Sequence, residues 1–261
     1  MAELTGQVAI ISGALGDIGR ACAIELARRG ADVALGGRSD GGRAKPLIQT
    51  IRQLGRQVRF DQVDVTDAEA VERWVADVQA ELGPPTLVIP NAAIVQQIPI
   101  RELTGEDFRR LLDVNLLGAF HLAQSAARRL LTQQRQGRIV FVGSWAAHAP
   151  HAHVPAYCVA KAGLRMLCQC MALEYAPWGI SVNEVAPGFV DAGLSRQVWE
   201  EAPQLRELCA RRVPIGQLMT AEEVAFHVAH LCDPRNHNMT GSALLCDGGL
   251  SLVTATSRGS E

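Results

Sequence analysis

The chain lacks any long run of apolar residues. Nowhere does the sequence approach the roughly 18 consecutive apolar residues that a membrane-spanning helix needs. The first segment, MAELTGQ, contains no basic cluster, and the apolar run after it covers only residues 8–11. We therefore expect neither a signal peptide nor a membrane span, and no membrane partner.

Cysteine motifs are equally absent. The seven cysteines are odd in number and scattered along the chain, and no C-x-x-C occurs. This pattern is typical of reduced thiols in a cytosolic protein and argues against a disulfide framework or a zinc site. We therefore expect a cytoplasmic protein without a bound metal.

The chain also lacks a large net charge. The net charge is -2 and no basic run stands out, so nothing favours nucleic acid as a partner. What the chain does have is apolar content, because hydrophobic residues make up 48% of its 261 residues, and its 24 glycines supply tight turns. This length and composition suit one large α/β domain or two small ones.

Short apolar segments alternate with longer segments of helical periodicity. The pattern predicts strands at 8–11, 33–35, 58–63, 87–89, 139–142, 180–185 and 242–246. It predicts helices at 18–29, 44–54, 67–82, 106–133 (with a break near Gly118), 155–176 and 221–231. We therefore predict an α/β fold, a single domain over residues 1–261 built on a doubly wound parallel sheet with helices on both faces. Its ligand would lie beyond the carboxyl ends of the strands.

A glycine-rich segment, S-G-A-L-G-D-I-G at residues 12–19, separates the first predicted strand from the first predicted helix. Glycines let the backbone approach a pyrophosphate, and a helix N-terminus offers free amides and a positive dipole end. The segment therefore indicates a dinucleotide-binding turn, with a simple strand-to-helix turn as the alternative. Asp17 would repel a pyrophosphate, so we expect its side chain to cap the helix and turn away.

Tyr157 and Lys161 lie four residues apart in a predicted helix, so their side chains share one face. A free phenol has a pKa of about 10, and a neighbouring cation lowers that pKa by favouring the phenolate. The pair can then exchange a proton with an alcohol or ketone near neutral pH. Pro155 would start the helix and place Tyr157 near its positive dipole end. The alternative is a tyrosine and a lysine that merely share a helix face.

With the glycine turn and Ser144, thirteen residues before Tyr157, the chain resembles the short-chain dehydrogenase/reductase family over residues 5–249. The resemblance implies a Rossmann-type fold and an NAD(P)-dependent oxidoreductase that acts on a secondary alcohol or ketone, a small-molecule substrate. It implies four catalytic residues: Tyr157 as general acid in reduction and general base in oxidation, Lys161 lowering its pKa and holding the nicotinamide ribose, Ser144 binding the substrate oxygen, and Asn115 holding a water.

The resemblance also assigns cofactor contacts. They come from the glycine turn, from segments that follow strands and from the predicted catalytic helix: Ser12, Gly13, Gly16, Ile18, Gly19, Arg38, Ser39, Asp64, Val65, Asn91, Ala92, Tyr157, Lys161, Pro187, Gly188 and Val190. The chain departs from the family pattern at Asp17, Pro90, Ala93 and Ala192. Because proline has no amide donor, hydrogen bonding near Pro90 must differ. The family often has a threonine where Ala192 stands, so a contact to the carboxamide is missing or replaced.

The end of the second predicted strand bears on the choice of cofactor. Family members specific for NAD have a carboxylate there for the ribose hydroxyls, whereas this chain has Gly37, followed by Arg38 and Ser39. Arg38 could pair with a 2′-phosphate and stack on the adenine, and Arg43 lies nearby. We predict NADP, with NAD as the alternative cofactor and a solvated loop arginine as the alternative role of Arg38.

The substrate side is less defined. We predict that Trp145, His151 and Leu194 border the substrate pocket and that residues 189–219 form a mobile lid, with an ordinary surface excursion as the alternative. His148, His151 and His153 could bind a metal, but their spacing matches no recognised ligand pattern. Residues 254–261 are predicted to form a flexible tail.

Several functional alternatives stay open. The chain resembles both 3-oxoacyl-[acyl-carrier-protein] reductases and sugar or polyol dehydrogenases. Arg128, Arg129 and Arg135 could dock an acidic carrier protein, which would make activity salt-sensitive, or they form only the solvated face of a helix. An alternative of a different class is an NADP-sensing binding protein without turnover, but the chain keeps all four catalytic positions.

By resemblance we also expect a homotetramer, in which helices 106–133 and 155–176 pack across a two-fold axis. Apolar stripes on these helices would form either that interface or the core of the chain itself: Leu111, Leu112, Leu116, Leu164, Leu167 and Met171.

Overall fold

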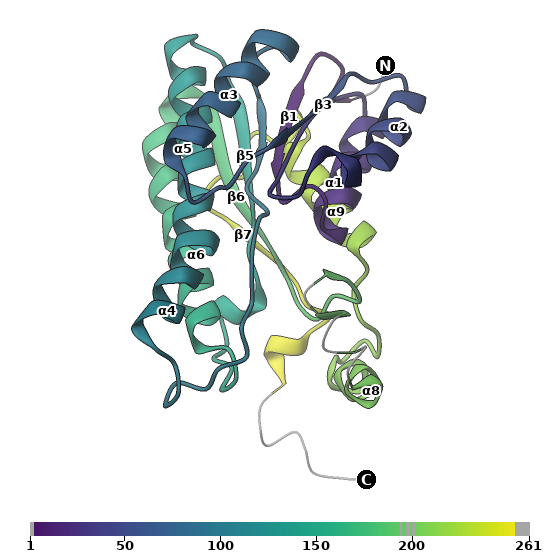
Figure 1. Cartoon of the computed structure of the whole chain (residues 1–261), viewed down its shortest axis with the longest axis vertical. Coiled ribbons are helices and arrows are strands. Elements are labelled where there is room, and N and C mark those ends of the chain that lie inside the picture. Colours follow the sequence, from purple (N-terminus) through teal and green to yellow (C-terminus); the bar gives the residue numbers. More distant parts are fainter. Residues whose placement is uncertain (1–2, 194, 197–198, 200–201, 254–261) are drawn as a thin grey trace.

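The computed structural model describes residues 3–193, 195–196, 199 and 202–253. Within these residues one sheet of seven parallel strands has the order β3-β2-β1-β4-β5-β6-β7 (Figure 1). The strands are β1 Val8–Ser12, β2 Asp32–Gly37, β3 Val58–Gln62, β4 Leu87–Ile89, β5 Gly137–Val142, β6 Ile180–Pro187 and β7 Ala243–Cys246. The order reverses between β1 and β4, so a ligand crevice is expected at the carboxyl ends of those two strands.

Helices cover both faces of the sheet, as the alternation of elements predicts (Figure 1). One face carries α1 Asp17–Arg28, α2 Lys45–Gln53 and α9 Ala221–Cys232, whose apolar sides pack into one buried cluster. The other carries α3 Ala68–Leu82, α5 Gly118–Thr132 and α6 Pro155–Tyr175 over a second cluster, and α4 Gly105–Leu112 packs against α6. Strands between two such layers are buried on both faces, which explains why β1 is entirely apolar up to Ser12. The predicted single-domain α/β fold is confirmed.

The segment predicted as one helix over 106–133 is interrupted. Between α4 and α5 the chain forms a π-helix over Asp113–Leu117, just before the break expected at Gly118. A Cβ on Gly118 would lie 2.5 Å from Cγ2 of Val65, so the helix approaches the segment after β3 too closely for any side chain. Of the apolar stripe residues, Leu111, Leu164 and Met171 are buried within the chain and belong to its own core.

The segment after β6 crosses the carboxyl edge of the sheet and contains α8, Pro203–Arg212 (Figure 1). Its side chains pack with the segment after β5 in a separate apolar cluster of Trp145, Trp199, Val213, Leu218 and Leu250. The predicted pocket residue Leu194 and the predicted tail over 254–261 lie outside the described residues. Among the described residues no helix is long and apolar enough to cross a membrane.

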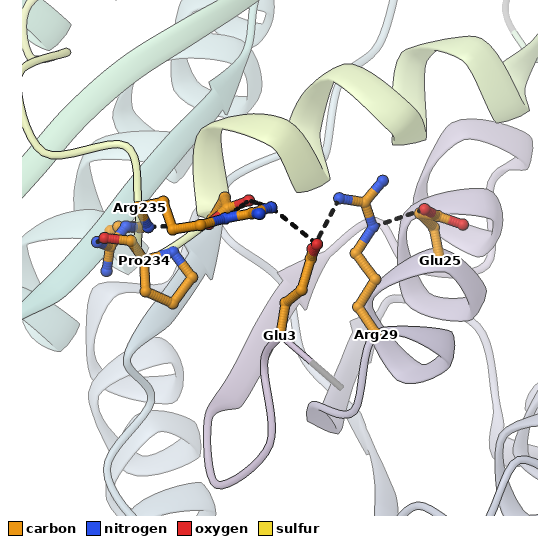
Figure 2. A network of polar contacts seen from close by, with 7 residues as sticks. Glu3, Glu25, Arg29, Pro234 and Arg235 are labelled. Carbon is orange, nitrogen blue, oxygen red and sulfur yellow. Dashed lines mark hydrogen bonds and ion pairs between the residues drawn. The ribbon is translucent and has the colours of Figure 1, made fainter. Parts of the chain in front are cut away.

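The opposite, amino edge of the sheet is held by a network of charged side chains (Figure 2). Glu3 accepts hydrogen bonds from Arg235 at 2.8 Å and from Arg29 at 3.4 Å, and Arg29 also pairs with Glu25 at 2.7 Å. The contacts tie the N-terminal segment to the end of α1 and to the chain after α9. These ion pairs are partly or largely exposed, so each contributes little to stability.

Candidate active site

The predicted phosphate turn lies at the switch point, between the end of β1 and the start of α1. Gly13 has φ +64°, and a Cβ there would lie 2.8 Å from the Cα of Ala92. A Cβ on Gly19 would lie 2.3 Å from the carbonyl oxygen of Gly13, so only glycine fits either position. Gly16 is the N-cap of α1 and no side chain caps this helix. The first amides of α1, including that of Ile18, therefore have no acceptor within the helix, and they suit a pyrophosphate.

A polar clamp joins this turn to the end of β4. The Asn91 Nδ2 donates to the carbonyl oxygens of Ser12 and Gly13 at 3.0 and 3.1 Å. The Ser12 Oγ accepts from the backbone amides of Asn91 and Ala92 at 3.1 and 3.2 Å. The side chains of Ser12 and Asn91 are thus used to hold the turn. Pro90, which lacks an amide, accepts through its carbonyl from Val142 at 3.1 Å.

Asp17 differs from its predicted role. Its carboxylate does not cap α1; instead it accepts a hydrogen bond from the amide of Gly193 at 2.8 Å and lies 3.4 Å from the Arg196 guanidinium. The expectation of a capping side chain was wrong, because the Asp17 carboxylate contacts the Gly193 amide and the Arg196 guanidinium, both in the segment after β6, instead of an amide of α1. Asp17 therefore connects the glycine turn to the predicted lid.

The carboxyl end of β2 presents basic and small side chains. Arg38 is exposed and takes part in no ion pair within the described structure, while Arg43 donates to the Ser39 Oγ at 3.4 Å. The nearby Asp40 turns its carboxylate to the amide of Gly42 at 2.8 Å, as N-cap of a short 3-10 helix. An unpaired guanidinium here fits a 2′-phosphate better than a ribose diol.

After β3, Asp64 accepts from the backbone amide and hydroxyl of Thr66, at 2.9 and 2.8 Å. Val65 is buried against Gly118, and its carbonyl contacts the His121 ring at 2.9 Å. The Asp64 side chain thus shapes the loop at the edge of the crevice.

The predicted proton-transfer residues come together at the carboxyl end of β5. Ser144 lies two residues after the end of that strand, and its Oγ accepts from the amide of Ala146 at 3.1 Å. Tyr157 and Lys161 lie on the first turns of α6, and the Lys161 Nζ is 5.5 Å from the centre of the tyrosine ring. Lys161 is buried and donates to the carbonyl of Val142 at 2.8 Å. The Tyr157 hydroxyl forms a hydrogen bond with Ser144, which links the helix to the strand end.

The expected acidification of Tyr157 does not occur in this structure. Burial raises the pKa of Tyr157 to about 12, and the hydrogen bond to Ser144 offsets only part of that rise. Burial also lowers the pKa of Lys161 to about 8, with the nearby Glu184 opposing the change. Desolvation disfavours the charged form of both groups and is the largest cause of both shifts in pKa. The phenol is therefore protonated at neutral pH.

Asn115 lies in the π-helix between α4 and α5 and is buried. Its side-chain Oδ1 accepts from the amide of Ile94, and its Nδ2 donates to the carbonyl of Ile94, both at 2.8 Å. Both polar atoms of the Asn115 side chain are therefore used in bonds to the loop after β4. A water at this residue would bind to the backbone carbonyl of Asn115 instead. A π-helix disrupts the regular ladder of backbone bonds and is frequent at functional sites.

The end of β6 closes the crevice. Gly188 donates to the carbonyl of Cys246 at 3.0 Å, and a Cβ on it would lie 2.8 Å from the Cα of Asp247. Pro187 pairs with Cys246 in the sheet, and Val190 forms a bridge with Met219. Ala192, where the family often has threonine, is buried and has no side-chain donor.

Aromatic side chains line the region between Ser144 and the segment after β6. The Trp145 ring packs edge-on against His151 at 4.2 Å and against Phe189 at 5.3 Å between centroids. The His151 Nε2 is buried without a hydrogen-bond partner, and burial lowers the pKa of this imidazole, so it is neutral at pH 7. That Trp145 and His151 border the substrate pocket stays a prediction. Among the described residues no group of three or more potential metal ligands occurs.

Two charged residues next to Ser144 were missed from the sequence. Glu184 of β6 is fully buried and forms an ion pair with Arg165 of α6. A signal was present, because a carboxylate inside a buried strand requires a partner, and Arg165 follows Tyr157 and Lys161 at the same four-residue spacing.

Comparison with known proteins places these features in a family. A family model described as enoyl-(acyl carrier protein) reductase matches residues 13–251. The 3-oxoacyl-[acyl-carrier-protein] reductase FabG of Pseudomonas aeruginosa is 32% identical over 250 residues, covering 96% of this chain and 99% of that protein. The cis-4-hydroxycyclohexanecarboxylate dehydrogenase of Sinomonas cyclohexanicum is 34% identical over 252 residues, covering 95% and 97%.

Solved structures agree with this placement. A short-chain type dehydrogenase/reductase from Mycobacterium marinum superposes with a TM-score of 0.89 at 30% identity, covering 95% of this chain and 96% of that one. A putative 2-deoxy-D-gluconate 3-dehydrogenase from Agrobacterium tumefaciens with bound NADP superposes with a TM-score of 0.88 at 27% identity, covering 96% and 98%. The similarity therefore extends over nearly the whole chain.

Proposed function

Because the chain belongs to the short-chain dehydrogenase/reductase family of NAD(P)-dependent oxidoreductases, we propose that it interconverts a secondary alcohol and a ketone with NADP as cofactor. The observation that carries this proposal is the assembly of Ser144, Tyr157 and Lys161 beside the glycine turn at the switch point. The glycine turn, the uncapped start of α1 and the unpaired Arg38 fit a dinucleotide with a 2′-phosphate. The structure solved with bound NADP supports the same choice, and NAD remains the alternative cofactor.

The protein's own residues would manage the proton. When bound, the nicotinamide cofactor supplies the hydride to the carbonyl carbon or accepts it from the alcohol. In reduction, the Tyr157 hydroxyl donates its proton to the carbonyl oxygen, and Ser144 donates a hydrogen bond to the same oxygen. The resulting phenolate is stabilised by the Lys161 ammonium nearby and regains a proton from solvent. A pKa of about 12 keeps Tyr157 protonated at neutral pH, the form that donates the proton in reduction.

The names of the relatives indicate the class of substrate only broadly. Their names include an acyl-carrier-protein reductase and dehydrogenases of hydroxylated rings or sugars. Arg128 and Arg129 lie at the end of α5, and Arg135 lies in the segment that leads into the amino end of β5, at the opposite edge of the sheet from Ser144. Arg129 is also paired with Glu72 at 2.5 Å. This placement favours a free small-molecule ketone over a substrate carried to the site from that patch.

The subunit arrangement is also a proposal. One face of α6 exposes apolar side chains, among them Val159, Met166 and Leu173. Exposed apolar groups on a long helix are typical of a protein–protein contact. We therefore infer a homotetramer in which α6 packs against its symmetry mate.

Replacement of one hydroxyl tests the reaction. Tyr157→Phe removes the proton donor and keeps the ring, so turnover should fall by about 10²–10⁴-fold while NADPH still binds. Steady-state NADPH oxidation with ketones, 3-oxoacyl thioesters and sugar lactones measures this, and fluorescence titration measures binding. Tyr175→Phe is the matched control, because Tyr175 is the only other tyrosine and lies at the far end of α6.

Retained turnover in Tyr157→Phe would contradict the assigned role. Binding of NADPH by the unaltered protein without turnover of any ketone would instead favour the alternative of a cofactor-sensing protein. Loss of activity on acyl-carrier substrates with rising salt, but not on free ketones, would favour carrier docking.

A further inference from the structure

A buried ion pair lies directly behind Ser144. Arg165 of α6 donates from Nε and Nη2 to the two carboxylate oxygens of Glu184, at 2.8 and 2.9 Å. Glu184 is 0% exposed, and the Arg165 side chain is 15% exposed. Neither residue takes part in the proton transfer described above, yet a carboxylate so buried is unfavourable without a compensating partner.

The two side chains of the pair pack against the backbone of Gly143 and Ser144. A Cβ on Gly143 would lie 1.9 Å from a Glu184 carboxylate oxygen, so Glu184 occupies the space that a side chain at residue 143 would need. Gly143 donates to the carbonyl of Val185 at 2.8 Å, which fixes it against β6. The Arg165 Nη2 also reaches the carbonyl oxygen of Ser144 at 3.5 Å. Both members of the pair therefore contact the Gly143–Ser144 segment.

The same pair lies on the helix face of the proton donor. Tyr157, Lys161 and Arg165 follow one another at four-residue spacing on α6. The charge of Glu184 raises the pKa of both Lys161 and Tyr157. The titratable groups around the pair are Tyr157, Cys158, Lys161 and Cys168 of α6, His148 after β5, and Asp247 after β7.

We propose that the Arg165–Glu184 pair is a positioning device that holds the Ser144 backbone and balances the charge beside Tyr157 and Lys161. Its effect on turnover depends on the proposed function, whereas its effect on the phenol does not. A lone carboxylate would favour the neutral phenol, and a lone guanidinium would favour the phenolate. The Arg165 guanidinium offsets part of the Glu184 charge at Tyr157, and burial is the largest influence on the pKa of the phenol.

Variants that unbalance the pair in opposite senses test this idea. Glu184→Gln keeps the shape and leaves the guanidinium alone, whereas Arg165→Met leaves the carboxylate alone. Arg165→Lys keeps the cation and loses the two-pronged contact, so it is the matched control. Each is made in a Tyr175→Phe background, in which Tyr157 is the single tyrosine and its ionisation can be followed by phenolate absorbance.

The first readout requires no activity. At the highest pH at which circular dichroism finds all variants folded, the phenolate fraction should decrease in the order Glu184→Gln, parent, Arg165→Met. The difference in apparent pKa should be roughly 0.5–1 unit for each charge change. Arg165→Lys should titrate as the parent does, and the comparison of Glu184→Gln with the parent decides if the methionine variant does not fold.

The second readout is the pH profile of kcat for NADPH-dependent ketone reduction. Its alkaline limb should move to lower pH in Glu184→Gln and to higher pH in Arg165→Met. In Arg165→Lys the profile should stay in place while kcat falls, because Ser144 loses its support. Equal phenolate fractions in Glu184→Gln and the parent, or shifts of the same sign in both charge variants, would overturn the proposal. A protein without turnover whose phenolate fractions follow the expected order would overturn only the proposed function.

Discussion

Asp17 places a carboxylate in a turn that is otherwise suited to a pyrophosphate. Its oxygen is held by the Gly193 amide and lies beside the Arg196 guanidinium, so part of its charge is compensated. Both side chains of the ion pair are partly exposed, which limits its contribution to stability to about 1 kcal/mol. The residue therefore links two functions, repelling a phosphate weakly while anchoring the segment after β6.

Two substitutions at Asp17 separate these functions. Asp17→Asn keeps an acceptor for Gly193 but removes the charge, so the Kd for NADPH should fall about 2–5-fold with little change in the KM for the ketone. Asp17→Ala also removes the acceptor, so the KM should rise by a similar factor. Fluorescence titration and steady-state kinetics measure the two constants. Equal KM values for both variants would rule out the anchoring role.

The secondary structure elements were largely predictable because each carries a strong local pattern. Buried strands such as β1 and β4 read as short apolar runs, and α3 ends where Gly83 takes positive φ. The interruption at Asp113–Leu117 was predicted only as a break near Gly118, and its π-helical form was not, because the contact of Gly118 with Val65 joins residues far apart in sequence.

The candidate site was predictable only where a motif is local. The glycine turn and the Tyr157–Lys161 spacing each lie within one segment, whereas the Asp17–Gly193 and Arg165–Glu184 contacts join distant segments. The pKa of Tyr157 was predicted in the wrong direction, since spacing on a helix reports a neighbouring cation but not the extent of burial.

The turn between β1 and α1 depends on close backbone contacts that a single methyl group would disturb. In Gly19→Ala the new Cβ would lie 2.3 Å from the Gly13 carbonyl oxygen, in the middle of the turn. We expect a loss of about 1–3 kcal/mol in stability and at least about tenfold weaker NADPH binding. Gly16→Ala is the control from the same turn, because its Cβ would meet only an ordinary 3.5 Å contact with the same oxygen.

Urea unfolding and NADPH titration of the two variants check this expectation. Gly16→Ala should unfold within about 1 kcal/mol of the parent, because its new Cβ meets no close contact and only the weaker N-cap preference of alanine is lost. A Gly19→Ala variant that binds NADPH as tightly as the parent would mean that the turn does not hold the cofactor.

In the whole molecule, the candidate site and the charged network lie at opposite edges of the sheet. The amino edge carries the charged network around Glu3 and Arg29, and the carboxyl edge carries the glycine turn, Ser144 and the segment with α8 (Figures 1 and 2). Glycine turns and polar loops at the carboxyl edge leave its backbone groups free for a ligand, while the packed helices on both faces keep the strand ends in register. The outer face of α6 exposes apolar side chains, among them Leu173.

The exposed apolar face of α6 leads to a prediction about that assembly. Leu173 is 83% exposed in the single chain, so Leu173→Glu should not unfold the protein but should bury a charge in a subunit contact. We expect a smaller molar mass by sedimentation or light scattering, with the melting of the subunit itself little changed. Ile100→Glu is the control, because Ile100 is 70% exposed and lies outside α6. If both variants keep the molar mass of the parent, α6 does not form the interface, and a parent that is already a monomer would exclude the tetramer altogether.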